Sequence, residues 1–225
     1  MPLDRARRLP YGWGINGRWP VELHRGGCIM GIISSGFRGR RSENPALPPG
    51  QHETQDFPVL TAGPAPLIPV QEWEFFITAE DGQRLAWSWD EFMALPQEEI
   101  TEDIHCVTSW SKLGTVWRGV SVDTLFENVE TTRDFATAHS FGGYTTNVPL
   151  WDLLGGKAWV AWEFDHEPLE RAHGGPARLL VPHLYFWKSA KWIHGLELTE
   201  EDVPGFWESN GYHLHGNPWS EERYS

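Results

Sequence analysis

The stretch His173-Gly-Gly-Pro-Ala-Arg178-Leu-Leu-Val-Pro-His-Leu-Tyr-Phe-Trp-Lys-Ser-Ala-Lys191-Trp combines a turn with the basic side chains of Arg178 and Lys191. Its glycines and proline predict a tight turn, and an apolar, extended run begins directly at Arg178. Arg178 offers a planar fork of donors and Lys191 offers a point charge, a combination that suits an anionic, phosphate-bearing ligand. On spacing alone, two solvated surface cations explain the pair equally well.

Around this stretch the chain alternates extended segments with short helices. Alternation of apolar and polar residues predicts strands at residues 72–78, 99–107, 135–140, 158–164, 178–186 and 191–199. Short helices are expected from the capping box at Ser88 to Pro96, over residues 121–129, and over residues 148–154. No internal repeat is present. The pattern predicts an α+β fold: a β-rich domain with a single mixed sheet and short helices.

Three regions differ in composition. Residues 1–29 are rich in Arg, Gly, Pro and Trp without any period, and we expect a non-native or irregular extension before a natural start at Met30. Residues 30–70 form an extended, proline-rich segment that we expect to wrap over the domain, because its prolines forbid helix while apolar residues such as Phe57 and Leu60 favour burial. Residues 71–225 are expected to form the domain itself.

Composition restricts the class of protein. The net charge of −13 repels phosphate backbones, so nucleic acid is not an expected partner. No apolar stretch approaches the roughly 20 residues of a membrane span. The chain has two cysteines, Cys28 and Cys106, and no recognisable signal peptide. A cytoplasmic, reducing location is therefore expected.

Two other kinds of site remain open from the residues alone. Ten histidines invite a zinc site, but His213-Leu-His215 has no third ligand nearby in sequence, and the adjacent His105 and Cys106 point to opposite sides of a strand. Cys106 with a distant histidine would also fit a thiol hydrolase, without local support. Packing explains most of the 14 tryptophans.

Four blocks in a fixed order carry a resemblance to a known family. Besides residues 173–192, they are Asp103-Ile-His-Cys-Val-Thr-Ser-Trp-Ser111, Phe141-Gly-Gly-Tyr-Thr-Thr-Asn-Val-Pro149 and Pro204-Gly-Phe-Trp-Glu-Ser-Asn-Gly-Tyr-His213. With these, residues 30–225 resemble the molybdopterin-binding domain of the sulfite oxidase family, in particular its short bacterial "sulfite oxidase-like" branch.

The resemblance implies a role for each site residue. Cys106 is the ligand of molybdenum, where a soft thiolate suits the metal, and Tyr144 is the active-site tyrosine beside it. The remaining residues are implied as contacts of the pterin cofactor: Thr61, Ala62, Ser140, His173, Arg178, Ser189, Ala190 and Lys191.

The resemblance also implies an activity. It predicts two-electron oxygen-atom transfer on a small sulfur- or nitrogen-containing substrate, either sulfoxide or N-oxide reduction or sulfite-like oxidation. An external one-electron carrier such as a cytochrome is expected, because no haem, flavin or cysteine-rich cluster motif is present. Around Cys106 stand Ser109, Trp110, Ser111 and Lys112, where sulfite-binding members have arginines. A non-catalytic module of the same fold that binds the cofactor or a partner is the alternative.

Overall fold

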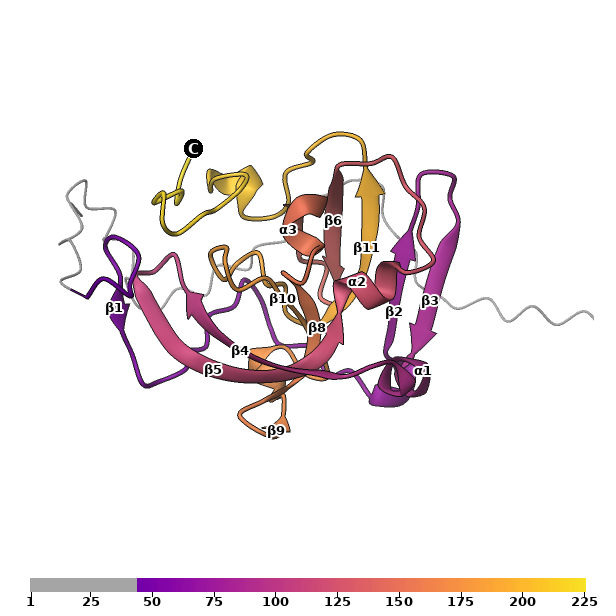
Figure 1. Cartoon of the computed structure of the whole chain (residues 1–225), viewed down its shortest axis with the longest axis horizontal. Helices are drawn as coiled ribbons and strands as arrows, with labels where there is room; N and C mark the ends of the chain where they lie inside the picture. Colours follow the sequence, from indigo (N-terminus) through magenta and orange to yellow (C-terminus); the bar gives the residue numbers. More distant parts are fainter. Residues whose placement is uncertain (1–43) are drawn as a thin grey trace, which may run out of the picture. The chain divides into compact units, whose positions relative to one another are not determined.

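Strands dominate the described part of the chain, residues 44–225 of this computed structural model, and they form two sheets (Figure 1). The six-stranded sheet contains β1 (His52–Glu53), β4 (Glu98–His105), β5 (Trp110–Ser121), β8 (Trp159–Phe164), β9 (Glu167–Pro168) and β10 (Arg178–Leu180). The five-stranded sheet has the order β3-β2-β11-β6-β7, with bounds Arg84–Ser88, Glu74–Thr78, Ile193–Thr199, Phe135–Ser140 and Thr145–Pro149.

Both sheets are mixed. Strand β1 runs parallel to β5, and β11 runs parallel to β2 but antiparallel to β6. The predicted β-rich class with short helices is confirmed, whereas the prediction of a single sheet is wrong. Strand pairing joins segments that lie far apart in the chain, and periodicity within each segment cannot specify those partners.

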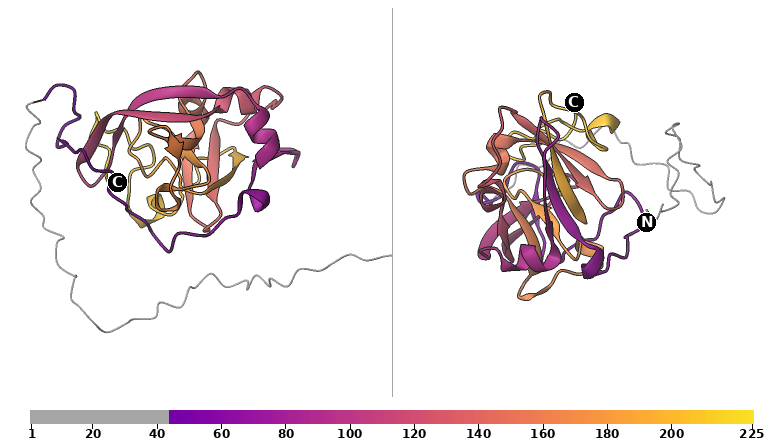
Figure 2. Two further views of the ribbon diagram at one scale, coloured as in Figure 1. Left: turned by 90° about the horizontal axis from the view of Figure 1, so that it is seen from below. Right: turned by 90° about the vertical axis from the view of Figure 1, so that its right-hand side faces the viewer.

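Alternation along β8 and β10 gives the larger sheet two buried faces. Val160 and Leu179 point into the main core, which they share with the inner face of the smaller sheet. Their neighbours Trp159 and Leu180 belong to a second cluster that includes Cys106. The curved hairpin of β4 and β5 carries this second cluster and is visible in Figure 1 and in the two views of Figure 2.

Short helices follow local signals. Helix α1 (Trp89–Ala94) begins at Ser88, whose hydroxyl accepts the N–H of Glu91, while the Glu91 carboxylate accepts the N–H of Ser88 at 2.8 Å. Helices α2 (Val122–Phe126) and α3 (Leu150–Leu153) lie within the expected ranges. Single 3-10 turns cover Val70–Glu72 (η1), Arg171–His173 (η2) and Glu208–Asn210 (η3). Among residues 44–225, every helix is too short or too polar to span a bilayer.

The strand predictions differ from the structure in several places, and strands β3 and β7, for example, were not predicted. The strand expected over residues 178–186 ends at Leu180, because Pro182 has no N–H to donate and the chain turns, with the N–H of Leu184 bonded to the carbonyl of Val181. The long strand β5 has no counterpart among the predicted strands. Its polar residues and glycines, including Gly114 and Gly119, interrupt the alternation that marks a strand.

The described part of the proline-rich segment contacts the domain at several points, which include the Leu60 carbonyl and the Ile68 side chain. Leu47 is buried, β1 adds to the edge of β5, and the Phe57 ring packs against the second cluster. Beyond it, Leu60 and Leu67 stay exposed. Wrapping of the whole segment 30–70 stays a prediction. The extension predicted at residues 1–29 lies outside the described residues, and the proposed boundaries stay predictions.

Candidate functional site

Cys106 lies in the turn that joins β4 to β5. Its N–H donates to the carbonyl of Trp110 at 2.8 Å, and the N–H of Ser109 donates back to the Cys106 carbonyl at 3.0 Å. Ser109 takes a positive φ of 75° to close the turn. The Cys106 side chain is buried with its sulfur 3.1 Å from Thr108 Oγ1. Burial raises the pKa of this thiol, so a metal that binds there must displace its proton.

Two side chains from distant parts of the chain hold this turn. Gln51 Nε2 donates to the carbonyl oxygen of Cys106 at 3.1 Å, and Arg223 Nη1 donates to that of Val107 at 2.6 Å. Neither residue was predicted from the sequence, since they lie 55 and 116 positions from the carbonyls they hold. Around Cys106 the sequence itself shows Ser109, Trp110, Ser111 and Lys112, and the structure adds Arg223 from a distant segment.

Arg178 begins β10 and is only 1% exposed. Its two terminal nitrogens donate to the carbonyl oxygens of His173, at 2.8 Å, and Ser189, at 2.6 Å, while the guanidinium lies 4.0 Å from the centre of the Phe186 ring. Burial lowers the pKa of Arg178 to about 9. Within residues 44–225, no carboxylate forms an ion pair with this buried cation, which is costly unless an anion binds there.

Lys191 is the second cation of this group. Its ammonium donates to the carbonyl oxygens of Ala172, at 2.7 Å, and Leu60, at 2.8 Å. Burial and then the charge of Arg178 lower the pKa of Lys191 to about 8. Burial, Lys191 and Arg178 also lower the pKa of His173, whose ring stacks on Phe57 at 3.9 Å. The three groups therefore act on one another, and we call His173, Arg178 and Lys191 the basic cluster.

Glycines in the preceding turn allow this close approach. A Cβ atom on Gly174, where φ is 114°, would lie 3.0 Å from the Cα atom of Lys191 and 3.1 Å from the Cβ atom of Arg178. A Cβ atom on Gly175 would lie 2.0 Å from the carbonyl oxygen of Leu169. The glycine pair seen in the sequence thus brings the basic cluster together.

The other predicted cofactor contacts divide into two kinds. Ser140, at the end of β6, has a buried hydroxyl oxygen without a hydrogen-bond partner in the described chain, so it has a free bond to offer a ligand. Thr61 and Ala62 are exposed and directly follow Leu60, whose carbonyl binds Lys191.

The backbone groups of Ser189 and Ala190 form hydrogen bonds to other residues of the protein. The N–H of Ser189 donates to the carbonyl of Phe186 at 3.2 Å, and the Ser189 carbonyl accepts from Arg178 at 2.6 Å. The Ala190 carbonyl accepts the N–H of Leu179 at 2.9 Å. Their observed contribution is to fix Arg178 in place.

Tyr144 lies close enough to Arg178 for the two side chains to interact electrostatically. Its hydroxyl donates to the carbonyl oxygen of Trp187 at 2.7 Å. Burial, followed by the charge of Glu208, raises the pKa of Tyr144, while Arg178 acts in the opposite direction. The phenol therefore stays protonated and lies within electrostatic reach of the basic cluster.

Electrostatics also connects Cys106 to the basic cluster, because a thiolate at Cys106 acts to raise the pKa of Lys191. A sulfur donor, two cations that form no ion pair with the described residues, and the unpartnered hydroxyl of Ser140 thus share one region. A metal that is held by sulfur and carries a phosphate-bearing organic group fits this donor set.

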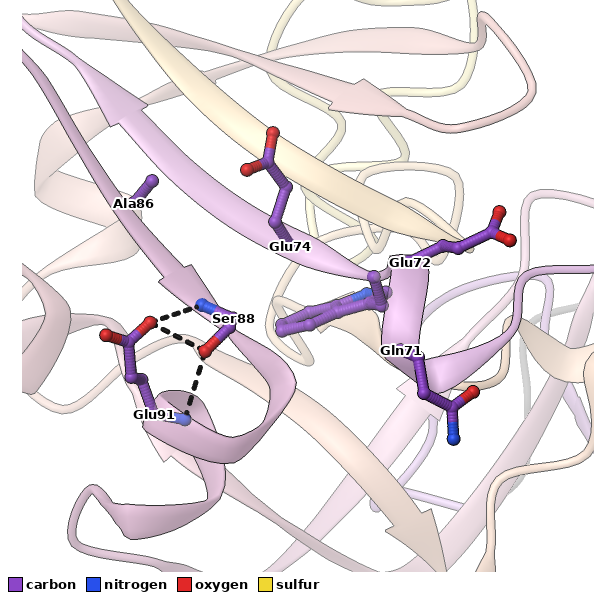
Figure 3. Close-up of a pocket in the computed structure, with 7 residues that line it drawn as sticks. Gln71, Glu72, Glu74, Ala86, Ser88 and Glu91 are labelled. Carbon is purple, nitrogen blue, oxygen red and sulfur yellow. Dashed lines mark hydrogen bonds between the residues drawn. The ribbon is translucent and has the colours of Figure 1, made fainter.

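A pocket where β2 begins and β3 ends does not compete with this region. It is lined by Gln71, Glu72, Trp73, Glu74, Ala86, Ser88 and Glu91 (Figure 3). Glu91 is engaged by the cap at Ser88, and Glu74 pairs with Arg84. Among the described residues, no group of three His, Cys, Asp or Glu side chains is arranged to hold a metal ion, which does not support the zinc alternative.

Comparison with known proteins agrees with this geometry. The family described as "Oxidoreductase molybdopterin binding domain" matches residues 62–207. The chain is 41% identical over 182 residues to the uncharacterized oxidoreductase YuiH of Bacillus subtilis, covering 80% of this chain and 92% of that protein. It is 31% identical over 134 residues to the putative protein-methionine-sulfoxide reductase subunit YedZ1 of Azospira oryzae, covering 58% of this chain and 50% of that one.

More distant similarities point the same way. The match to mitochondrial sulfite oxidase of Drosophila melanogaster is 31% identical but covers 34% of this chain and 13% of that protein. Among solved structures, the sulfane dehydrogenase SoxCD from Paracoccus pantotrophus shares the fold with a TM-score of 0.54 at 16% identity, over 61% of this chain and 40% of that chain. The chain belongs to the oxidoreductase molybdopterin-binding family, whose cofactor, molybdopterin with molybdenum, is the one that the sequence predicts.

Proposed function

We propose that this chain is a molybdenum–molybdopterin enzyme that catalyses two-electron oxygen-atom transfer on a small sulfur- or nitrogen-containing substrate. The observation that carries the proposal is the buried cation of Arg178 beside Lys191, which has no counter-ion among residues 44–225, in a protein with a net charge of −13. Evolution of a stable fold alone would favour a counter-ion or an apolar residue at such a position. An anionic cofactor supplies the missing charge.

Each residue has a defined task in this proposal. The thiolate of Cys106 ligates the metal, while Arg178, Lys191 and His173 bind the phosphate and pterin groups, and Ser140 donates or accepts one further hydrogen bond. When bound, the molybdenum cofactor would supply the two-electron redox chemistry, giving an oxygen atom in the oxidation or accepting one in the reduction. We propose that Tyr144, whose raised pKa keeps it protonated at neutral pH, exchanges its bond to the carbonyl of Trp187 for one to a substrate oxygen.

The direction of the reaction and the substrate belong to the proposal as alternatives to be separated by experiment. Relatives include proteins named as methionine-sulfoxide reductase subunits and as sulfite oxidases. Arg223 at the Cys106 turn restores one cation near the metal position, which keeps an anionic substrate such as sulfite within the proposal beside neutral S-oxides and N-oxides. We also propose an external one-electron carrier and a cytoplasmic location.

Metal analysis tests the proposal first. The full chain, purified from a host that makes the cofactor, should contain about one molybdenum and one pterin per chain. Cys106→Ser should lose most of the molybdenum, whereas Cys28→Ser should keep it. Metal-free wild-type protein from such a host would refute the enzyme and favour a module that binds a partner.

Turnover tests the second part. Stopped-flow mixing of the oxidised protein with sulfite, and of the reduced protein with sulfoxides and N-oxides, should change the metal's absorption with one substrate class. Loaded protein that reacts with none of these compounds would support the non-catalytic alternative.

A further inference from the structure

Two side chains that lie far away in the sequence form hydrogen bonds to the backbone of the Cys106 turn. Gln51, from the proline-rich segment, bonds the carbonyl of Cys106, and Arg223, from the segment that follows η3, bonds the carbonyl of Val107. Arg223 also donates to Pro49 O at 3.3 Å through its second nitrogen, so it ties the two segments to each other. Its guanidinium lies 5.0 Å from the centre of the Tyr185 ring.

Both side chains are fixed by further contacts. Gln51 is buried, and its amide oxygen accepts from Ser111 at 3.3 Å. Ser111 in turn bonds His105 Nδ1 at 2.8 Å, and His105 directly precedes Cys106. The carboxylate of Glu222, next to Arg223, accepts from the N–H of Asn217 at 2.8 Å and lies 2.8 Å from His215 Nδ1. A charged fork whose backbone is anchored in this way holds its acceptor more rigidly than a mobile surface arginine does.

We propose that Gln51 and Arg223 are positioning residues that hold the Cys106 turn in the conformation in which its sulfur ligates the metal. Each bonds one of two consecutive carbonyl oxygens, so neither the Cys106–Val107 nor the Val107–Thr108 peptide plane can reorient without breaking a hydrogen bond. The role in metal ligation rests on the proposed function. The mechanical part, restraint of the turn, does not.

Amide hydrogen exchange of the full chain tests the restraint without reference to the metal. Arg223→Gln should speed exchange of the Cys106 and Ser109 amides about tenfold, the factor that corresponds to one lost charge-assisted hydrogen bond, and leave the β11 amide of Leu196 unchanged. Gln51→Ala should act on the same two amides. Arg223→Lys should recover part of the protection, since an ammonium can bond one of the two carbonyls.

Matched controls are available on the same domain. Arg118 is an exposed arginine of β5, and Gln83 is an exposed glutamine, so Arg118→Gln and Gln83→Ala should leave both turn amides at the wild-type rate. Equal acceleration of all amides, or unchanged turn amides in both Arg223→Gln and Gln51→Ala, would overturn the proposal. If Arg223→Gln does not fold, Arg223→Lys and Gln51→Ala carry the same comparison.

A spectroscopic readout tests the role in ligation. In loaded protein, Arg223→Gln should alter the paramagnetic-resonance signal of the one-electron-reduced metal. X-ray absorption should show a longer metal–sulfur distance or a wider spread of distances. Arg118→Gln is the control for both measurements. An unchanged signal together with faster turn exchange would overturn the ligation role alone. Wild-type protein without molybdenum would instead defeat the proposed function and leave the exchange result standing.

Discussion

The ammonium group of Lys188 lies 2.7 Å from Glu208 Oε1, and both side chains are completely shielded from solvent. Lys188 also donates to the backbone and side-chain oxygens of Asn147, each at 2.8 Å, while Glu208 accepts from Thr146 and Trp187. This buried pair therefore ties β7, the segment after β10 and the 3-10 turn η3 together.

Breaking this pair on one side should be costly. Lys188→Met leaves the Glu208 carboxylate buried without its cation, and we expect a loss of about 3–5 kcal/mol in the free energy of unfolding. The double variant Lys188→Met/Glu208→Leu should lose less than the sum of the two single changes, because the unpaired charge is gone. Urea titration of all four proteins measures the coupling. Additive losses would show that the two side chains stabilise the fold independently.

The lowered pKa of Lys191 predicts an unusual pH dependence of the folding stability of the protein without cofactor. Its pKa of about 8 in the folded state lies below that of an unfolded lysine, so above pH 8 the unfolded state binds more protons and stability rises with pH up to about 10.5. Lys191→Met should flatten this rise, and a bound anion should remove it by favouring the charged form. Since Lys191 is partly exposed, the effect is reduced by solvent screening.

Urea titrations at pH 7.5 and 10 measure this effect in the wild type, in Lys191→Met and in Lys157→Met, which removes an exposed lysine that bonds the carbonyl of Trp151. If Lys191→Met and Lys157→Met change the pH dependence equally, the basic cluster does not bury an unpaired charge.

The raised pKa of His215 predicts that the stability of the C-terminal segment falls as pH rises, the opposite of the effect of Lys191. Hydrogen bonds to Asp152, at 3.1 Å, and Glu222, at 2.8 Å, raise the pKa of His215, although burial opposes them. This stabilisation is fully present below the unfolded pKa of about 6.5 and is lost as pH rises through the higher folded value. His183 shares Asp152, and His213 faces Glu222 at 3.6 Å.

We therefore expect His215→Gln to cost about 1 kcal/mol at pH 6 and less at pH 8.5. Limited proteolysis of the C-terminal segment at both pH values measures the change, with His166→Gln, an exposed histidine 3.9 Å from Glu99, as the control. A cost that does not fall with pH would show that the charged form of His215 contributes nothing.

Gly175 offers a steric prediction. Gly175→Ala would place a Cβ atom 2.0 Å from the carbonyl oxygen of Leu169, and the backbone must shift to avoid it. We expect a loss of about 1–3 kcal/mol in stability and, because the turn positions Arg178, a lower cofactor content. Gly142→Ala is the control: nothing lies within 4 Å of that Cβ position, and stability should change by less than about 0.5 kcal/mol. Equal cofactor content in both variants would contradict the role of the turn.

Much of the fold and site follows from local sequence. The capping box at Ser88 predicted helix α1 because its two hydrogen bonds join residues three apart. The strand β6 was predicted with its observed bounds, and the Gly-Gly-Pro turn before Arg178 was predicted from its residue types. The basic cluster could be named in advance because its members lie within one short stretch, residues 173–191.

Sequence by itself determined which residue types are available for a sulfur ligand and an anion site, since spacing and turn chemistry act over a few residues. Only the tertiary structure decided that the strands form two sheets and that Arg178 is buried without a counter-ion among the described residues. It also brought Gln51 and Arg223 to the turn of Cys106. The physical reason is that strand pairing and burial depend on contacts between segments that are distant in the sequence. Neither periodicity nor spacing along the chain predicts those contacts.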